Sequence, residues 1–137
     1  MNTFSLKIFA ADKVFYQGLC SSLVVPTVDG QYGIQARHEN TIIAVDIGIA
    51  AFTDGNGKRQ SAVLSEGICK VEDNEVVIMV ETAERPEEID RVVAEREAAE
   101  ALEALRGRDN MSDVKRAKAK MARAASRLRA KGGHEID

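Results

Sequence analysis

Residues 81–90, with the sequence ETAERPEEID, separate two kinds of sequence. Before this stretch, apolar residues come in short runs of period two that are broken by Gly, Asp and Asn. After Pro86, Gly and Pro are absent for twenty residues, and apolar residues recur three and four positions apart. A period of two is typical of strands, and a period of three to four is typical of helices. We therefore predict a β module at 1–85, joined by a hinge to an α module at 86–137.

The hinge carries signals for the start of a helix. Thr82 is the predicted cap, and Pro86 suits a first-turn position, where its missing N–H is no loss. Glu87, Glu88 and Asp90 then place negative charge at the positive end of the helix dipole. The pattern predicts that the last strand leads directly into the first helix.

The β module reads as eight to ten short strands with turns at close spacing, which indicates a β-sandwich or a small barrel. Asp54-Gly55-Asn56-Gly57 is its clearest turn, because these residues accept the positive φ angles of tight hairpins. Pro26 is expected to end a strand at 21–25, since it cannot donate to a central ladder. The clearest predicted strands cover 4–8, 14–19, 21–25, 41–45, 47–52, 58–64, 67–71 and 75–81. The predicted fold class is mostly β plus α: a β-sandwich of about ten strands followed by an antiparallel two-helix hairpin.

The two predicted helices differ in charge. Residues 86–106 carry seven acidic and three basic residues, a net of −4, whereas 112–131 carry eight basic residues and one Asp, a net of +7. The stretch 107–110 is expected to form the turn between them, and Ser112 is a reasonable cap for the second helix. Two helices joined by so short a loop must lie antiparallel.

The predicted contact between the helices is poor in large apolar side chains. An Ala in place of a Leu gives up about 2 kcal/mol of burial at its position. The helix hairpin should therefore rearrange at a cost of a few kcal/mol, which leaves a minor state populated. The second helix contributes the stripe Val114, Ala117, Met121, Ala124 and Leu128, and the first contributes Ile89, Val92, Val93, Ala99, Leu102 and Leu105, interrupted by Arg96.

No window of this 137-residue chain reaches the roughly eighteen consecutive apolar residues of a membrane span, and Asp12 and Lys13 lie where a signal peptide would be apolar. We therefore expect a soluble protein that is not exported and does not insert into the membrane. Cys20 and Cys69 lie 49 positions apart without a pairing motif or a nearby His, which indicates reduced thiols and no metal site.

Several motifs in order resemble the epsilon subunit of the bacterial F-type ATP synthase, over nearly the whole chain. They are Pro26-Thr27, Gly30-Gln31-Tyr32-Gly33-Ile34, His38, Asp46-Ile47-Gly48, Glu66-Gly67, Asn74, and Glu81-Thr82-Ala83-Glu84 running to Ile89-Asp90.

The resemblance implies a non-catalytic central-stalk subunit of the rotor in a proton- or sodium-translocating complex. It implies that the β-sandwich binds the gamma subunit and the c-subunit ring, and that the helix hairpin either folds down or extends along gamma to restrain ATP hydrolysis by the alpha and beta subunits. It also implies a peripheral place on the cytoplasmic face of the bacterial plasma membrane. The implied c-ring contacts are Gln31, Tyr32 and His38, and the implied inhibitory contacts with beta are Lys115, Arg116, Lys118, Arg123 and Arg127.

The chain also departs from the family pattern. Gln31 stands where the family usually has Glu, and Asn40 stands where Pro is common. Many bacterial members carry an Ile/Leu-Asp-x-x-Arg-Ala motif associated with ATP binding, but here the Arg position is Val93. Arg91 lies two residues away, about 200° around the helix, and does not substitute for it. We expect no cofactor and at most weak ATP binding, with Asp90, Arg123 and Arg127 as the remaining candidate ligands.

Some single residues have two interpretations. His38 either contacts the c ring or orders its own loop through a hydrogen bond, and the second interpretation is favoured. Tyr32 and Ile34 are either exposed contact residues or seal the end of the sandwich. The basic stripe of the second helix is either a solvated face or a binding surface for an acidic partner; its single sign favours the partner.

Two other classes of function fit the sequence less well. A nucleic-acid-binding module would use the basic second helix, but the net charge of −3 and the aromatic content of 4% argue against it. A stand-alone enzyme is less favoured still, because no nucleophile, base and anion-binding loop occur together. No catalytic residue and no metal ligand is therefore assigned.

Overall fold

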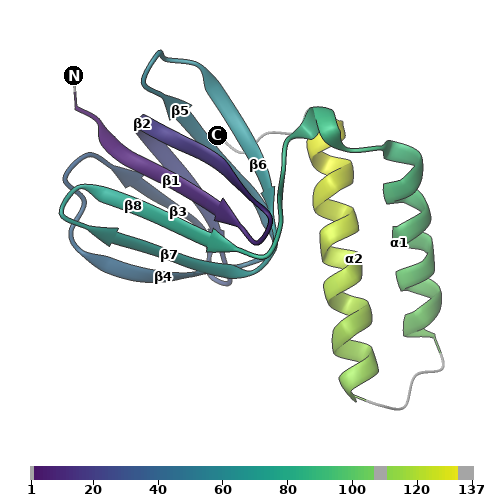
Figure 1. The fold of residues 1–137 in the computed structure, drawn as a ribbon. Helices are drawn as coiled ribbons and strands as arrows, with labels where there is room; N and C mark the ends of the chain where they lie inside the picture. The colour runs from purple at the N-terminus through teal and green to yellow at the C-terminus, as the bar shows by residue number, and fades with distance from the viewer. Residues whose placement is uncertain (1, 107–110, 133–137) are drawn as a thin grey trace.

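The computed structural model describes residues 2–106 and 111–132, and it consists of a β-sandwich with a helix hairpin beside one end (Figure 1). The predicted fold class is confirmed. The two helices run side by side in opposite directions (Figure 1). The strands are β1 (Phe4–Ala10), β2 (Lys13–Thr27), β3 (Gly30–Gln35), β4 (Thr41–Val45), β5 (Gly48–Asp54), β6 (Arg59–Leu64), β7 (Gly67–Glu72), β8 (Glu75–Val80) and β9 (Ala83–Glu84).

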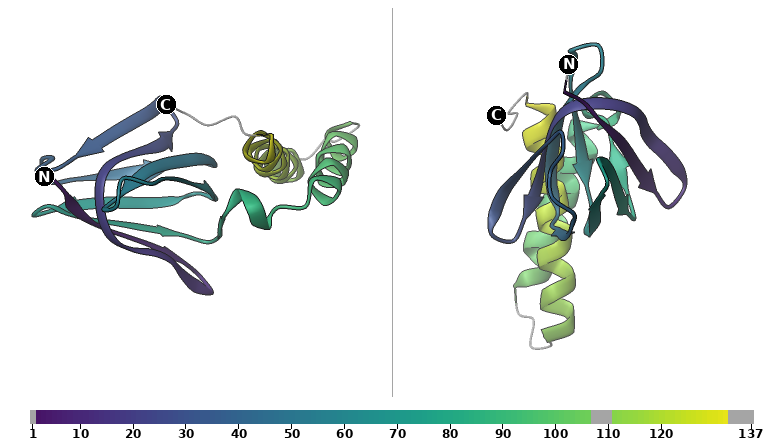
Figure 2. Two further views of the ribbon diagram at one scale, coloured as in Figure 1. Left: turned by 90° about the horizontal axis from the view of Figure 1, so that it is seen from above. Right: turned by 90° about the vertical axis from the view of Figure 1, so that its left-hand side faces the viewer.

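The strands pair in the order β4-β7-β8-β1-β2-β5-β6-β9, with β3 paired to β2. The pairing of β1 with β8 is parallel, and the other pairings are antiparallel. The long strand β2 belongs to both layers, because its first half pairs with β1 and its second half with β3 and β5. Figure 2 shows β2 curving from one layer to the other.

The prediction of two separate strands at 14–19 and 21–25 was wrong, since β2 runs unbroken from Lys13 to Thr27. Its pairing with β5 shifts register between Cys20 and Ser22, and this irregularity lies where the strand passes between layers. Pro26 lies inside β2 opposite Gln31, near the strand end, where a missing N–H is tolerated.

The core between the layers follows the period-two pattern. Phe4, Leu6 and Ile8 of β1 point inward and are at most 1% exposed. They pack with residues such as Leu64 and Phe52 of the opposite layer. All buried members of this cluster lie between residues 4 and 83, so the helices contribute none of them.

The hinge differs from the prediction. Thr82 does not cap a helix; its N–H donates to Ser65 Oγ at 2.9 Å. Pro86–Glu88 form a single 3-10 turn, η1, capped by Arg85, whose N–H donates to Glu88 Oε1 at 2.9 Å. The chain then becomes extended at Ile89 before the first helix starts. That extended residue separates the turn from the helix, so the proline signal belongs to the turn.

The helix α1 (Arg91–Leu105) starts at Asp90, whose side chain accepts hydrogen bonds from the N–H groups of Val92 and Val93. The helix α2 (Met111–Lys131) already includes Ser112, so the predicted cap was wrong. The predicted turn at 107–110 lies outside the described residues.

The predicted stripe of α1 was also largely wrong. Val92, Val93 and Leu102 are 70%, 37% and 48% exposed, respectively, whereas Ala94 and Ala101 are buried. In α2 the predicted Ala117 and Ala124 are buried. The two helices thus meet through alanines seven residues apart, because small side chains permit a close approach. Val92 and Leu102 are left largely exposed instead.

A chain ending at Glu88 should fold without the helices, because the core cluster needs no residue beyond 83 and Arg85 keeps its contacts. We expect a cooperative thermal transition and a β-type far-UV circular dichroism spectrum. Non-cooperative melting of this shortened chain would contradict the independence of the β module.

The two cysteines should be unreactive in the folded chain. Burial raises the pKa of Cys20 to about 11 and that of Cys69 to about 12. Since only the thiolate is nucleophilic, both thiols should stay protonated and silent toward a disulfide reagent at pH 8, and should react fully in denaturant. Rapid modification of either thiol in the native chain would contradict this.

Candidate functional site

The contact between the β-sandwich and the helix hairpin contains a small apolar cluster. Ile49 of β5 and Val63 of β6 point away from the sandwich core and meet Ile89, Ala94 and Ala130. Their neighbours Ala50 and Leu64 belong to the core instead, as alternation along a strand requires. The extended backbone at Ile89 brings its side chain into this cluster. The cluster therefore covers part of the outer face of one layer.

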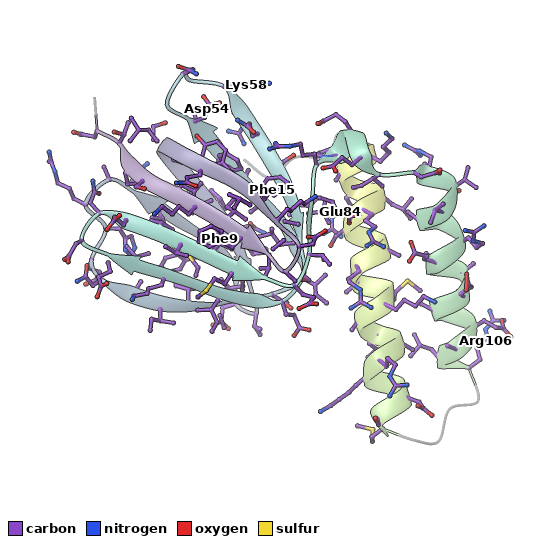
Figure 3. The ribbon with its side chains drawn as sticks, in the orientation of Figure 1. Phe9, Phe15, Asp54, Lys58, Glu84 and Arg106 are labelled. Carbon is purple, nitrogen blue, oxygen red and sulfur yellow. The ribbon has the colours of Figure 1, made fainter. Side chains whose placement is uncertain are left out.

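Arg127 of α2 lies beside this apolar cluster and binds two carboxylates. Its Nε donates to Glu84 Oε1 at 2.7 Å, and its Nη1 donates to Glu97 Oε1 at 3.1 Å. The Arg127 side chain is 21% exposed. Burial alone would lower the pKa of Arg127, but the hydrogen bonds and charges of Glu84 and Glu97 outweigh it and raise the pKa. We call these three residues the ion triad; Glu84 lies between the sheet and α2 (Figure 3).

Arg85, next to Glu84, is held by the sandwich. Its Nη1 donates to Gln60 Oε1 at 3.1 Å, and its Nη2 donates to the Phe15 carbonyl at 2.9 Å. Its guanidinium carbon lies 4.3 Å from the centre of the Phe15 ring, a cation–π geometry. The hinge is therefore fixed to the sandwich at this residue.

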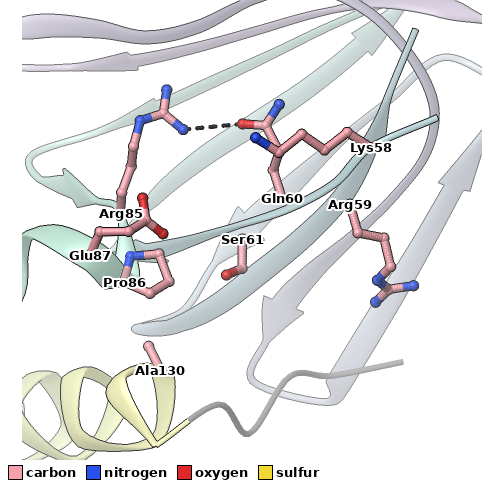
Figure 4. Close-up of a pocket in the computed structure, with 8 residues that line it drawn as sticks. All are labelled: Lys58, Arg59, Gln60, Ser61, Arg85, Pro86, Glu87 and Ala130. Atoms are coloured by element: carbon pink, nitrogen blue, oxygen red, sulfur yellow. Dashed lines mark hydrogen bonds between the residues drawn. The ribbon is translucent and has the colours of Figure 1, made fainter. Parts of the chain in front are cut away.

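A cavity of about 270 Å³ opens beside Arg85 (Figure 4). Arg85 points toward Gln60 in this view, and Arg59 points away from both. Lys58 also extends toward Gln60 in this view, and the guanidinium of Arg85 is already bonded to Gln60 and to the Phe15 carbonyl. The lining residues of the cavity are Lys58, Arg59, Gln60, Ser61, Arg85, Pro86, Glu87 and Ala130.

A second cavity, of about 300 Å³, lies between the hinge and the hairpin and contains two of the candidate nucleotide ligands, Asp90 and Arg127. Asp90 is occupied in capping α1, and Arg127 is already paired with two glutamates. The apolar side chain of Val93 provides no positive charge that could bind a triphosphate. The lining is Glu84, Glu88, Ile89, Asp90, Val93, Ala94, Glu97 and Arg127, which sets four carboxylates against one cation. The charged groups of this lining are therefore mostly acidic.

Arg123, the third candidate ligand, faces a small hollow beside the second cavity, together with Ser65, Thr82 and Glu84. The structure thus places Asp90, Arg123 and Arg127, the three candidate ATP ligands, near the same junction. What the sequence did not indicate is the set of acidic residues that surrounds them.

The predicted c-ring residues lie on β3 and the loop that follows it. Tyr32 Oη lies 3.0 Å from His38 Nε2, and His38 Nδ1 lies 2.8 Å from the Glu39 carbonyl oxygen. Because a carbonyl oxygen only accepts, Nδ1 carries a proton toward Glu39, and Nε2 faces the tyrosine hydroxyl. His38 therefore orders its loop. Ile34 is 1% exposed and seals the core, while Gln31 is exposed.

The five basic residues assigned to an inhibitory contact do not share one environment. Lys115, Arg116 and Lys118 are exposed, whereas Arg123 is half-buried and Arg127 belongs to the ion triad. Only the first three are therefore available to a partner in this arrangement.

The sequence analysis missed an apolar row on the outer face of the other layer. Five residues from neighbouring strands form it through direct cross-strand pairs: Ala44 with Ile68, Ile68 with Met79, Met79 with Phe9, and Phe9 with Val14. Ile68 and Met79 are each 48% exposed and Val14 is 54% exposed. Contiguous exposed apolar surface marks an interaction site. We call these five residues the outer row.

A signal for the outer row exists in the sequence. The strands TIIAV and EVVIMV are apolar at successive positions, so both faces of each strand are apolar. A half-solvated sheet alternates apolar and polar residues. The departure from alternation indicates a second covered face.

Neither a membrane-spanning helix nor a metal site is present among the described residues. No described helix is long and apolar enough to cross a membrane. Within residues 2–106 and 111–132, no group of three His, Cys, Asp or Glu side chains is placed to hold a metal ion.

The chain is similar to known proteins over nearly its whole length. The family model for the beta-sandwich domain of the ATP synthase delta/epsilon chain matches residues 3–86. The ATP synthase epsilon chain of Ruminiclostridium cellulolyticum is 35% identical over 95% of this chain and 96% of its own. That of Clostridium novyi is 38% identical over 92% of this chain and 95% of its own.

Solved structures share the fold. A chain of the Euglena gracilis mitochondrial ATP synthase, in a structure of OSCP, F1 and c-ring, has a TM-score of 0.82 at 22% identity, covering 92% of this chain and 79% of its own. A chain of the Tetrahymena thermophila mitochondrial ATP synthase central stalk and c-ring has a TM-score of 0.66 at 15% identity, covering 93% and 95%. At such identities the likeness concerns the fold alone, but the matched sandwich model and the bacterial relatives show that the chain belongs to the epsilon-chain family of ATP synthases.

Proposed function

We propose that this chain is a non-catalytic subunit of the ATP synthase rotor that couples the catalytic head to the c ring. The outer row carries the proposal, because an exposed apolar row across five paired strands is covered in a functional assembly. We assign it to the gamma subunit. Membership of the epsilon-chain family supports this assignment, since the resemblance implies gamma as the partner of the sandwich.

The c-ring contact is assigned to the end of the sandwich that carries Gln31, Tyr32 and His38. The Tyr32–His38 hydrogen bond holds the loop in one shape, and Gln31 next to it is exposed. Catalysis belongs to the alpha and beta subunits, at the cytoplasmic face of a bacterial plasma membrane. The family match gives no support to the nucleic-acid alternative.

The hairpin is proposed to restrain ATP hydrolysis when it leaves the sandwich. Its contact with the sandwich combines few apolar residues with the ion triad, so leaving it costs little burial. Lys115, Arg116 and Lys118 are exposed and available for an acidic surface of the beta subunits.

Charge placed in the outer row should weaken gamma binding. Ile68→Lys or Met79→Lys removes roughly 1.5–3 kcal/mol of apolar burial, or about ten- to hundredfold in affinity. Val28→Lys is the matched control, because Val28 is 82% exposed and lies outside the row. Titration of the full chain with gamma measures the affinities, and equal affinities for all three variants would contradict the assignment.

Deleting residues 107–137 should raise ATP hydrolysis by the reconstituted complex and leave assembly intact. Replacing Lys115, Arg116 and Lys118 with Ala should give most of the same release, since Ala preserves helix propensity. Full inhibition by the triple variant would show that the restraint is steric. An unchanged rate after the deletion would end the inhibitory proposal.

ATP binding to the isolated chain should be weak or absent. The missing arginine at position 93 removes a charged hydrogen bond of about 1.5–3 kcal/mol, or roughly ten- to hundredfold in affinity. Calorimetric titration should show stronger binding for Val93→Arg. Tight binding by the unaltered chain would contradict the expectation.

A further inference from the structure

We propose that Arg127 and Glu84 form an ionic latch that decides whether the helix hairpin stays on the sandwich. The proposal rests on the mobile hairpin of the proposed function and names the contact that controls it. Arg127 belongs to α2, Glu84 to β9 and Glu97 to α1, so one guanidinium joins both helices to the sandwich.

The two carboxylates have different parts in the latch. Glu97 lies on the helix that packs against α2, so a hairpin that moves as a unit carries Glu97 with Arg127. Glu84 stays behind, because β9 pairs with β6 opposite Val63 and the adjacent Arg85 is bonded to Gln60 and Phe15. The contact that breaks on release is therefore Arg127–Glu84. Glu97 is a positioning residue that keeps the guanidinium aimed at Glu84.

Apolar burial contributes little to the contact between hairpin and sandwich, so the charges of the latch determine whether the hairpin stays docked. The cluster around Ile49 and Val63 receives only Ile89, two alanines and the partly buried Leu128 from the helical side. The side chains of the Arg127–Glu84 pair are 21% and 30% exposed, so solvent and salt still reach the pair, and its 2.7 Å hydrogen bond is charge-assisted. Removing one partner leaves a half-buried charge unpaired, which favours release.

The latch also occupies the guanidinium that would otherwise be available to a ligand in the cavity between hinge and hairpin. Arg127 is the cation of the cavity between hinge and hairpin, and its hydrogen bonds already go to Glu84 and Glu97. The docked state is thus held from within the chain. We expect ionic strength to control docking and millimolar ATP to leave it unchanged.

The test measures the distance between the modules in the full chain. Spin labels are placed at Asn56→Cys in the turn between β5 and β6 and at Lys118→Cys on α2, two exposed positions. The native Cys20 and Cys69 are buried and should not be labelled. Pulsed dipolar spectroscopy then gives the fractions of docked and released hairpin.

Glu84→Gln and Arg127→Gln should each raise the released fraction at least about tenfold, because each breaks a charge-assisted hydrogen bond. Raising the salt concentration should release the unaltered hairpin but change these variants little. Lys120→Gln is the control: it breaks the more exposed Lys120–Glu100 pair, at 3.7 Å, and should leave docking unchanged. The exchanged pair Glu84→Arg with Arg127→Glu should recover part of the docked state.

A distance distribution that stays docked in both single variants would overturn the latch. Should a variant fail to fold, the salt titration of the unaltered chain still decides, because a docked fraction independent of salt also overturns it. Failure of the latch is distinct from failure of the proposed function. If deletion of residues 107–137 raises ATP hydrolysis, the proposed function holds whatever the spin labels show. If the variants release the hairpin but the deletion leaves hydrolysis unchanged, only the latch holds.

Discussion

The arrangement of the two modules depends on two adjacent residues of opposite charge. Arg85 is bonded to Gln60 and Phe15 of the sandwich, and Glu84 is bonded to Arg127 of the hairpin. The first contact fixes where the sandwich ends, and the second fixes where the hairpin lies. Since both residues belong to one short extended segment, the backbone has little freedom between them. The junction is therefore small in apolar area and defined by hydrogen-bond geometry.

The sequence predicted the strands and the helices well because the apolar residues of strands and of helices recur with different periods. Alternation in Phe4–Ala10 and the alanine-rich helical spacing after residue 90 needed no tertiary information. The boundaries were harder. Pro86 indicates a helix start, but a 3-10 turn satisfies the same signal, and Asp90 is the better cap because Ile89 is buried in the junction. Local helix propensity does not report the tertiary contact that buries Ile89.

The site was predicted only in part, for a related reason. Asp90, Arg123 and Arg127 were chosen as a group, and the structure places them at one junction. The partners of Arg127 were not foreseen, because Glu84 and Glu97 are 43 and 30 positions away in sequence. The exposure of Val92 and Leu102 was missed because a heptad stripe does not say which of two possible faces meets the partner. Small residues form the contact between the two helices, since they permit a closer approach of the helices.

The two outer faces of the sandwich differ in what covers them. Ile49 and Val63 lie on the outer face of the layer that contains β5 and β6, and the chain's own hairpin covers them. The outer row lies across β4, β7, β8, β1 and the first part of β2, and its members Val14, Ile68 and Met79 are exposed. A partner on the outer row and the hairpin on the other layer thus need not compete for the same surface. Under the proposed function, the sandwich would stay bound through one face while the hairpin docks on or leaves the other.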